Sequence, residues 1–464
     1  MDYDVLILGG GIIGCAVAYE LSKYSLNVAL IEKNYDIADD VALTNTAIVY
    51  DGMECEDTLM AKLEFMGNAM FEDITKKFNI PFKRCGSLIT AEGEKGEAEI
   101  ERLYNRAQDR GIEYVRLLNG YEAKEIEPGL GEGTGRALYS PNTGVVCPYD
   151  LAIAYGEVAF DNGVIFRLEE EVLDIEKTSR GVKVTTNKNK FTCRMVLNTI
   201  PGQHYRIDPD RNKSIKSEEY INYILIDEDN NDKYSNIVFS LKENGGSAYY
   251  INTLTEHSIL SVRTDKVLSL EETLNAVACL EVNIDRDGID SFYSDQSSND
   301  VIIIDDSYLN NGYIRITGSH YGRVTMTPAI AKMVCETIVG NLNGRPRKDF
   351  KDSRREIFKF RELSNEERHQ LIKVDKNYGK VICTCRLITE GEIIDSIRRP
   401  LGARTLQGIQ RRTGAAIGKC KSSYCLNRII KILARETNRQ VTEIVKDSKK
   451  SRLVMCRIKE FDDV

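Results

Sequence analysis

The sequence predicts an α/β protein in which a parallel sheet is interrupted by an inserted, strand-rich domain and followed by a small separate module. Three observations lead to this prediction: a glycine-rich turn between two apolar strands at the start, strands that return only after residue 160, and a change of charge near residue 378. With 464 residues, the chain has room for about three domains of ordinary size.

The first expected element is a strand over residues 4–8, with the apolar sequence DVLIL. The run GGGIIG follows and opens an apolar helix that we expect to continue to about Tyr24. A second strand, NVALIE, ends at Glu32. A strand, a helix and a strand in this order form a βαβ unit with two parallel strands.

The region between about residues 54 and 127 is charged and has a helical pattern. Strand patterns return in GVIFRL, GVKVTT, FTCRMVLN, YINYILID, SAYYIN and SILSVRT, and later in VIIID and YIRITG before the helical run MTPAIAKMVCETIVG. A βαβ unit whose sheet is completed so late in the chain indicates a discontinuous domain. The predicted boundaries are 1–75, 145–205 and 300–345 for this first domain, 76–144 and 206–299 for an inserted substrate domain, 346–377 for a charged linker, 378–435 for a cysteine-bearing module and 436–464 for a C-terminal extension.

Charge separates the last part of the chain from the rest. Residues 378–464 contain 19 basic and 9 acidic side chains, whereas residues 1–377 contain 44 basic and 62 acidic ones. A basic module on an acidic body is suited to docking on an acidic surface or to surrounding an anionic centre. The basic residues are not interleaved with aromatic ones, so we expect no nucleic-acid partner.

Composition points to a globular protein of the cytoplasm. Hydrophobic residues make up 42% and charged residues 29% of the chain, and no stretch has the ~18 uninterrupted apolar residues of a transmembrane segment. The start, MDYDVLILGGG, has neither a basic region nor a cleavage site, which argues against a signal peptide. In a reducing compartment, clustered cysteines indicate a metal site rather than disulfides.

Gly9, Gly11 and Gly14 form a GxGxxG motif that follows a strand and opens a helix, and Glu32 ends the next strand. Such glycines let the backbone approach a pyrophosphate, and the free N–H groups of the helix start attract it. Glu32 is suited to hold a ribose hydroxyl, and its charge would repel a 2′-phosphate, which disfavours NADP. The alternative is a glycine-rich turn that binds no ligand.

Four cysteines lie in two close pairs, Cys383 with Cys385 and Cys420 with Cys425, separated by 34 residues. Paired thiolates can hold a [2Fe-2S] cluster or a structural zinc ion. Basic neighbours would offset the negative charge of a cluster and raise its reduction potential, whereas zinc would gain nothing from them. These neighbours are Arg386, Arg411, Arg412, Lys419 and Lys421. The pattern favours the cluster and leaves zinc as the alternative.

The run VICTCRLITEGEIIDSIRRPLGARTLQGIQRRTGAAIGKCKSSYC resembles the bacterioferritin-associated-ferredoxin type of [2Fe-2S] domain. In particular it is similar to the version at the C-terminus of FAD-dependent dehydrogenases of the glycerol-3-phosphate dehydrogenase and 2-hydroxyglutarate oxidase type. The resemblance extends through the opening βαβ unit, FRELSNEERHQLI and VTEIVKDSKKSRLVM, and so covers nearly the whole chain. It implies a Rossmann-like FAD-binding domain of the glutathione-reductase type, an inserted mixed α+β substrate domain and a small helical iron–sulfur domain.

The resemblance also implies site residues. The segment ALTNTAIVYDG resembles the loop beside the flavin, where Asn45 and Thr46 keep family-like residues and Tyr50 stands in place of the usual histidine. Arg323 replaces a glycine, and the loop that carries His320 is expected to face the flavin. The predicted catalytic residues are therefore Tyr50, His320 and Arg323. The resemblance further assigns to the FAD site Ile13, Lys33, Val172, Val324 and Thr325.

The expected function is that of an FAD-dependent dehydrogenase of a small hydroxy acid, amino acid or polyol phosphate. A fused cluster gives the reduced flavin an exit other than oxygen, which favours a dehydrogenase over an oxidase. The resemblance implies a second flavoprotein or another electron-acceptor subunit as partner. Because the family's arginine after Tyr293 is missing and Tyr50 is a poor proton acceptor, we expect glycerol 3-phosphate to be a poor substrate. The alternatives are a non-catalytic FAD and [2Fe-2S] electron-transfer or scaffold subunit, and a zinc-stabilised regulatory module.

Overall fold

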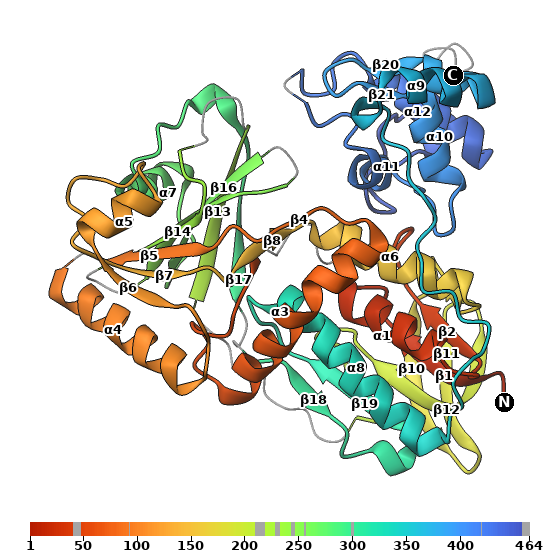
Figure 1. Ribbon diagram of the computed structural model, residues 1–464. Helices are drawn as coiled ribbons and strands as arrows, with labels where there is room; N and C mark the ends of the chain where they lie inside the picture. Colours follow the sequence, from red (N-terminus) through yellow and green to blue (C-terminus); the bar gives the residue numbers. More distant parts are fainter. Residues whose placement is uncertain are drawn as a thin grey trace.

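The computed structural model describes residues 1–39, 48–91, 93–208, 219–227, 233–242, 246–254, 257–297, 301–418 and 420–456. Within these residues, two large sheets lie side by side and a small helical module at the end of the chain lies over the first of them (Figure 1). The sheet topology confirms the α/β fold class predicted from the sequence.

The first sheet is built around β1 (Tyr3–Leu8), which pairs in parallel with β2 (Val28–Ile31) and β12 (Lys190–Asn198). Its strand order is β10-β11-β12-β1-β2-β9, with β19 beside β12 and β18 beside β19. The remaining strands are β9 (Ile165–Arg167), β10 (Val172–Thr178), β11 (Gly181–Thr186), β18 (Ile303–Asp305) and β19 (Tyr313–Thr317). Three distant parts of the chain therefore form one sheet.

The apolar run of β1 is buried on both faces. Val5 and Ile7 belong to a core shared with α1 (Ile12–Ser22), α6 (Pro148–Asp161) and α8 (Arg323–Leu342), and α3 (Thr58–Phe78) packs on α8. Leu6 and Leu8 pack in a second core with side chains of β10 and β11. Burial on both faces explains why this strand is a continuous hydrophobic run rather than an alternating one.

The second sheet has the strand order β17-β13-β16-β15-β14-β5-β7-β6. Its strands are β5 (Ser87–Ala91), β6 (Arg116–Asn119), β7 (Arg136–Ser140), β13 (Glu219–Asp227), β14 (Ile237–Leu241), β15 (Ser247–Asn252), β16 (His257–Thr264) and β17 (Ile289–Ser297). A small sheet of β3 (Ile48–Val49), β8 (Gly144–Val146) and β4 (Phe82–Lys83) lies between the two large ones. The helices of this region are α4 (Gly93–Asp109), α5 (Gly120–Ile126) and α7 (Leu270–Val277).

The region from residue 54 to 127, which the sequence predicts as helical, also contributes strands β4, β5 and β6. These strands are short, and each is held by pairing with a distant partner, β5 with β14 and β7 for example. The hydrophobic pattern of a short segment does not depend on its distant pairing partner and so cannot reveal it. The helical prediction was therefore wrong for these residues.

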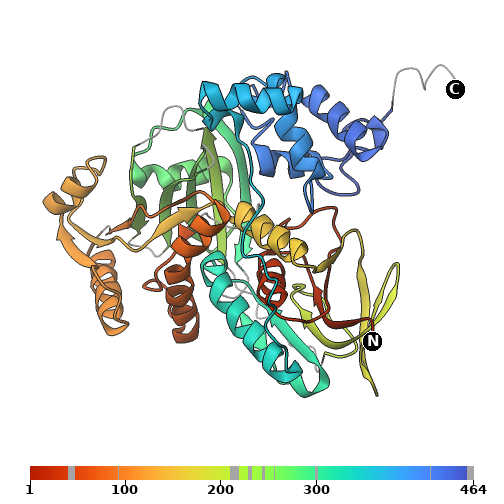
Figure 2. The ribbon, with the colours of Figure 1, turned by 45° about the vertical axis from the view of Figure 1, so that its right-hand side comes forward.

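The C-terminal module has its own core, formed by α10 (Glu390–Arg398), α11 (Leu406–Thr413) and α12 (Leu426–Thr437). The hairpin of β20 (Val381–Cys383) and β21 (Ile388–Thr389) and the helix α9 (Asn365–Val374) precede them. Ile444 and Leu453 pack on the same core, so residues 436–456 continue the module. The module lies against α6 of the first domain (Figure 2). None of the described helices is both long and apolar enough to cross a membrane.

Candidate functional site

A cavity of about 300 Å³ opens at the carboxyl ends of β1 and β2. Gly9 and Gly11 line it from the turn after β1, Glu32 and Lys33 line it from the end of β2, and Val172 lines it from β10. All five are residues that the sequence analysis assigned to cofactor binding. The crevice beyond the carboxyl ends of parallel strands is the usual place for a dinucleotide in this kind of fold.

The glycines of the turn are required by its geometry. Gly9 has a φ of +103°, and a Cβ atom there would lie 2.7 Å from Oγ1 of Thr199. A Cβ at Gly14 would overlap with the carbonyl oxygen of Gly9, so α1 can approach the turn only because that position has no side chain. Gly11 is the N-cap of α1 and supplies no side-chain cap, which leaves the first N–H groups of the helix for a ligand. The side chain of Ile13 packs on the core behind the turn.

Glu32 is held at the rim of the cavity by two backbone groups. The amide of Gly10 donates to Oε2 at 2.7 Å, and the amide of Asn34 donates to Oε1 at 2.8 Å. These bonds fix the carboxylate where a ribose would lie over the turn. The bare backbone of the turn, the uncapped helix and the fixed carboxylate together fit the diphosphate and ribose of FAD.

The start of α8 meets the segment that follows residue 47. Oγ1 of Thr325 accepts a hydrogen bond from the amide of Tyr50 at 3.0 Å and contacts the carbonyl of Ile48 at 3.4 Å. Val324 and Thr325 are completely buried there. Their predicted contact with FAD stays a prediction, and Asn45 and Thr46 lie outside the described residues.

His320 is buried and both of its ring nitrogens have protein partners. Nδ1 accepts a hydrogen bond from the amide of Gly322 at 2.9 Å, and Nε2 lies 3.4 Å from Sγ of Cys55. This arrangement anchors the loop at the start of α8. The geometry therefore gives His320 a structural role, and its predicted role in catalysis has no support from these contacts. Arg323 is the first residue of α8 and is partly exposed.

Tyr50 and Tyr321 form the boundary between the two large domains. Tyr50 is almost fully buried, and its ring meets that of Tyr321 edge to face, with 4.8 Å between the centroids. The hydroxyl of Tyr321 is buried and has no hydrogen-bond partner among the described residues. A buried polar atom without a partner is costly, so this hydroxyl is a group that a ligand could satisfy.

Arg263 on β16 is a cation that the sequence analysis missed. Its guanidinium carbon lies 5.1 Å from the centroid of the Tyr321 ring. Around it the inner face of the second sheet is aromatic: Tyr223 and Tyr293 stack with their centroids 4.9 Å apart, and Tyr249 lies beside Tyr223. From the resemblance, an arginine was expected only after Tyr293. The signal that would have found Arg263 is the pairing of β13 with β16 and β17, which brings these residues to one face.

Three buried or partly buried acids, also missed, lie near the same boundary. Burial and, to a lesser extent, the nearby Asp51 raise the pKa of Glu54 to about 7, although Arg263 opposes both effects. Burial raises the pKa of Glu64 well above its ordinary value and so favours the neutral form of this carboxyl. Glu64 is on α3 and its side chain reaches the loop before α8, where Oε1 lies 3.6 Å from Nδ1 of His320; neither oxygen has a hydrogen-bond partner among the described residues.

The four predicted cluster cysteines converge. The thiol of Cys385 is hydrogen-bonded to Cys420, and that of Cys383 to Cys425. The contact with Cys385 lowers the pKa of Cys420, and backbone N–H groups of the loop 422–424 lower it further. Positive φ angles of Lys421 (45°) and Ser422 (64°) turn these N–H groups toward the sulfur. Such a nest of amides stabilises an anionic ligand.

This arrangement fits a two-iron cluster better than a single zinc ion. The thiols form two pairs, and a [2Fe-2S] cluster needs two thiolates on each of two irons, whereas zinc needs four ligands around one centre. Cys385 is exposed while Cys383 and Cys425 are buried, so one edge of the site faces solvent.

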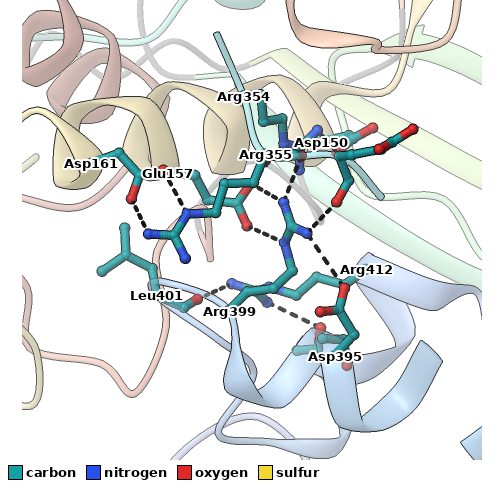
Figure 3. A network of polar contacts seen from close by, with 12 residues as sticks. Asp150, Glu157, Asp161, Arg354, Arg355, Asp395, Arg399, Leu401 and Arg412 are labelled. Atoms are coloured by element: carbon teal, nitrogen blue, oxygen red, sulfur yellow. Dashed lines mark hydrogen bonds and ion pairs between the residues drawn. The ribbon is translucent and has the colours of Figure 1, made fainter. Parts of the chain in front are cut away.

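Ion pairs join the module to the first domain (Figure 3). Arg354 of the linker binds Asp150 at 2.8 Å and Glu157 at 2.7 Å, both on α6. Arg399, at the end of α10, binds the same Glu157 at 3.1 Å. Burial alone would raise the pKa of Glu157, but the two guanidinium groups hold it below its ordinary value. The module is therefore attached by buried, charge-compensated contacts.

The fold and these two sites define a redox protein that binds a dinucleotide and an iron–sulfur cluster. Residues 4–337 match the family model of the FAD dependent oxidoreductases, and residues 381–435 match that of the BFD-like [2Fe-2S] binding domain. The chain belongs to the FAD dependent oxidoreductase family, and its cofactors are FAD and a [2Fe-2S] cluster. The resemblance stated from the sequence is thereby confirmed.

Relatives span the chain to different extents. A glycerol 3-phosphate dehydrogenase of Caloramator mitchellensis is 33% identical over 97% of this chain and 98% of its own length. A mitochondrial L-2-hydroxyglutarate dehydrogenase of Nematostella vectensis is 31% identical over 42% of this chain and 46% of its own. Among solved structures, the FAD-bound L-alpha-glycerophosphate oxidase of Mycoplasma pneumoniae has a TM-score of 0.66 at 19% identity, covering 77% of this chain and 99% of its own. At that identity it shows the common fold alone.

Proposed function

We propose that the protein is a dehydrogenase of a small alcohol that carries an anionic group, with glycerol 3-phosphate as the first candidate. The observation that carries this proposal is the position of Arg263 against Tyr321, whose buried hydroxyl has no partner among the described residues. A guanidinium over the ring of a tyrosine whose own hydroxyl has no partner offers a cation and a hydrogen-bond donor that can bind a phosphate or a carboxylate. Arg263 thus supplies the cation that the sequence analysis found missing after Tyr293.

This proposal revises the expectation that glycerol 3-phosphate is a poor substrate. The relative that matches nearly the whole chain is a glycerol 3-phosphate dehydrogenase, and the iron–sulfur module is included in that match. A 2-hydroxy acid is the second candidate, because L-2-hydroxyglutarate dehydrogenases match a shorter part of the chain. Both substrates have a secondary alcohol near an anionic group, and both would use Arg263 in the same way.

Glu54 is the best placed proton acceptor. It lies near Arg263 and Asp51, and its pKa of about 7 is suited to accept a proton from an alcohol at neutral pH. When bound, FAD supplies a hydride acceptor and the [2Fe-2S] cluster supplies a one-electron carrier. The residues of the chain hold the anionic group at Arg263, take the hydroxyl proton at Glu54 and exclude water with the aromatic face of the second sheet.

The electrons leave, we propose, at the exposed edge of the iron–sulfur module. Leu387 and Tyr424, which flank cluster cysteines, are 50% and 77% exposed. Lys421 and Arg428 are exposed beside them. Apolar and aromatic side chains with a basic rim suit a protein partner with an acidic surface, such as a second flavoprotein or another acceptor subunit.

The test is anaerobic mixing of the holoprotein with glycerol 3-phosphate, L-2-hydroxyglutarate or an amino acid, while flavin and cluster absorbance are followed separately. Glycerol 3-phosphate should bleach the flavin absorbance before the absorbance of the cluster changes. Arg263→Ala should raise the substrate concentration needed for half-maximal bleaching by roughly ten- to a hundredfold. Cys420→Ser should leave flavin bleaching intact and stop reduction of an acceptor protein. If no substrate bleached the flavin while a separate protein reduced the cluster, the non-catalytic electron-transfer subunit would replace this proposal.

A further inference from the structure

The segment of residues 33–39, which follows β2, has two functional sides. One side lines the dinucleotide cavity through Lys33, Asn34 and Asp39. The amide of Ala38 donates to the carbonyl of Gly10 at 2.9 Å and so ties the segment to the glycine-rich turn. The other side of the segment contacts the iron–sulfur module.

The contact is made mainly by two arginines of α11. Arg412 binds Asp36 through two parallel hydrogen bonds, Nη1 to Oδ2 at 2.6 Å and Nη2 to Oδ1 at 2.7 Å. The two side chains are only 5% and 2% exposed. Arg411 forms an ion pair with Asp39, itself a residue of the cavity. A Cβ atom at Gly408 would lie 2.7 Å from Oδ2 of Asp36, so the helix backbone lies directly against that carboxylate.

An apolar contact supports the ion pairs. Leu401, which precedes α11, packs against the core of the first domain. A Cβ atom at Gly156 of α6 would lie 2.5 Å from Cδ1 of Ile37 and 3.2 Å from Cδ1 of Leu401, which places these two side chains over the same point of the helix. The segment 36–39 is thus held between the glycine-rich turn and the iron–sulfur module.

We propose that Arg411 and Arg412 are positioning residues of the FAD site, so that FAD affinity depends on the docked iron–sulfur module. Without Arg412, Asp36 would be a buried carboxylate that has lost both of its guanidinium hydrogen bonds and keeps only the charge of the nearby Arg404, and the segment would have to move to hydrate it. That movement would displace Lys33, Asn34 and Asp39 from the cavity wall. By linkage, bound FAD must strengthen the docking of the module by the same factor.

The first experiment measures FAD affinity of the full chain after removal and re-addition of FAD. Arg412→Ala should weaken FAD binding by about 5- to 100-fold, the range of ordinary coupling between sites. Arg399→Ala is the matched control, because Arg399 is equally buried and crosses the same interface to Glu157 without touching residues 33–39. It should change FAD affinity by no more than about twofold. Iron content and the visible circular dichroism of the cluster show whether the module stays folded in each variant.

A second measurement tests reciprocity without any enzymatic activity. Amide hydrogen exchange of α11 should be slower with FAD than without it in the wild type, and this difference should vanish in Arg412→Ala. A conservative Arg412→Lys variant should recover part of the FAD affinity, since it keeps the charge and loses one of the two hydrogen bonds. The proposal is overturned if Arg412→Ala binds FAD normally, or if Arg399→Ala weakens FAD binding as much as Arg412→Ala does.

Discussion

Two glutamates near the start of α3 have different roles because their surroundings differ. Glu54 is partly exposed and lies near Arg263, and its pKa of about 7 allows it to exchange a proton at neutral pH. Glu64 is completely buried beside the start of α8, and burial raises its pKa and favours its neutral form. Neither role is visible in the sequence, because both depend on groups from distant segments.

Glu54→Gln should lower the rate of flavin reduction by about 10²- to 10⁴-fold, the usual contribution of a general base. In the wild type the rate should rise with pH through about 7, where Glu54 loses its proton, and this rise should be absent in the variant. Glu56→Gln, at an exposed neighbour that pairs with Arg102, is the control. A wild-type rate that did not depend on pH in this range would contradict the assignment.

Glu64→Gln should stabilise the protein, and more so as the pH rises. The folded-state pKa of Glu64 is raised, so the folded protein keeps a proton that the unfolded chain releases above about 4.5. Wild-type stability is therefore lost with increasing pH, whereas glutamine does not titrate. Melting temperatures of the two proteins should diverge between pH 5 and pH 8 by a few degrees. The exposed Glu94→Gln variant should show no such divergence.

At the scale of elements, the approach of α1 to the turn after β1 sets the geometry of the dinucleotide cavity. Gly14→Ala should push the helix away from the carbonyl of Gly9, costing about 1 to 3 kcal/mol and most of the bound FAD. Gly340→Ala on α8 is the matched helical control, because nothing lies within 4 Å of its Cβ position. Flavin content of the purified proteins is the measurement, and equal content in the two variants would refute the prediction.

The sequence predicted elements whose signal is local. The βαβ unit could be predicted because an apolar strand, a glycine motif and a helix follow one another in the sequence. The four cysteines could be predicted as a site because of their spacing. Strands such as β5 and β14, which depend on pairing with each other, were missed. Arg263 and Glu54 were missed for the same reason, since their proximity arises from a sheet register and a loop. Asp36 and Arg412, which form a bidentate pair, are separated by 376 positions. The domain boundaries stay predictions.

At the scale of the whole molecule, charge is divided between an acidic body and a basic module. Acidic residues of the body neutralise the arginines that face it, as Glu157 and Asp36 do. Lys421 and Arg428 are exposed on the module and form no ion pair with an acid of the described residues, so they add to a positive surface near the cluster. This surface should attract an acidic partner over a distance comparable with the Debye length of about 8 Å at physiological salt.

Exchange of both residues, Lys421→Glu with Arg428→Glu, should slow reduction of the acceptor protein about tenfold or more and leave flavin reduction by substrate unchanged. Raising the ionic strength should slow acceptor reduction in the wild type and have little effect in the variant. Lys348→Glu, an exposed position at the start of the linker, is the control for a change in total charge. An acceptor rate that is insensitive to salt would count against an electrostatic docking site.

The linker of residues 346–377 binds α6 of the first domain before the chain enters the iron–sulfur module. Arg354 and Arg355 fasten it to α6, through Asp150, Glu157 and Asp161, before it reaches the module (Figure 3). A linker that is bound to the first domain in this way restricts the movement of the iron–sulfur module. These contacts predict that the cluster keeps a fixed position relative to the first domain, so that the proposed acceptor protein would have to come to it. Cutting the backbone within the linker should leave the two pieces together as a nicked complex, because the contacts on both sides of the cut are those of a built-in subunit.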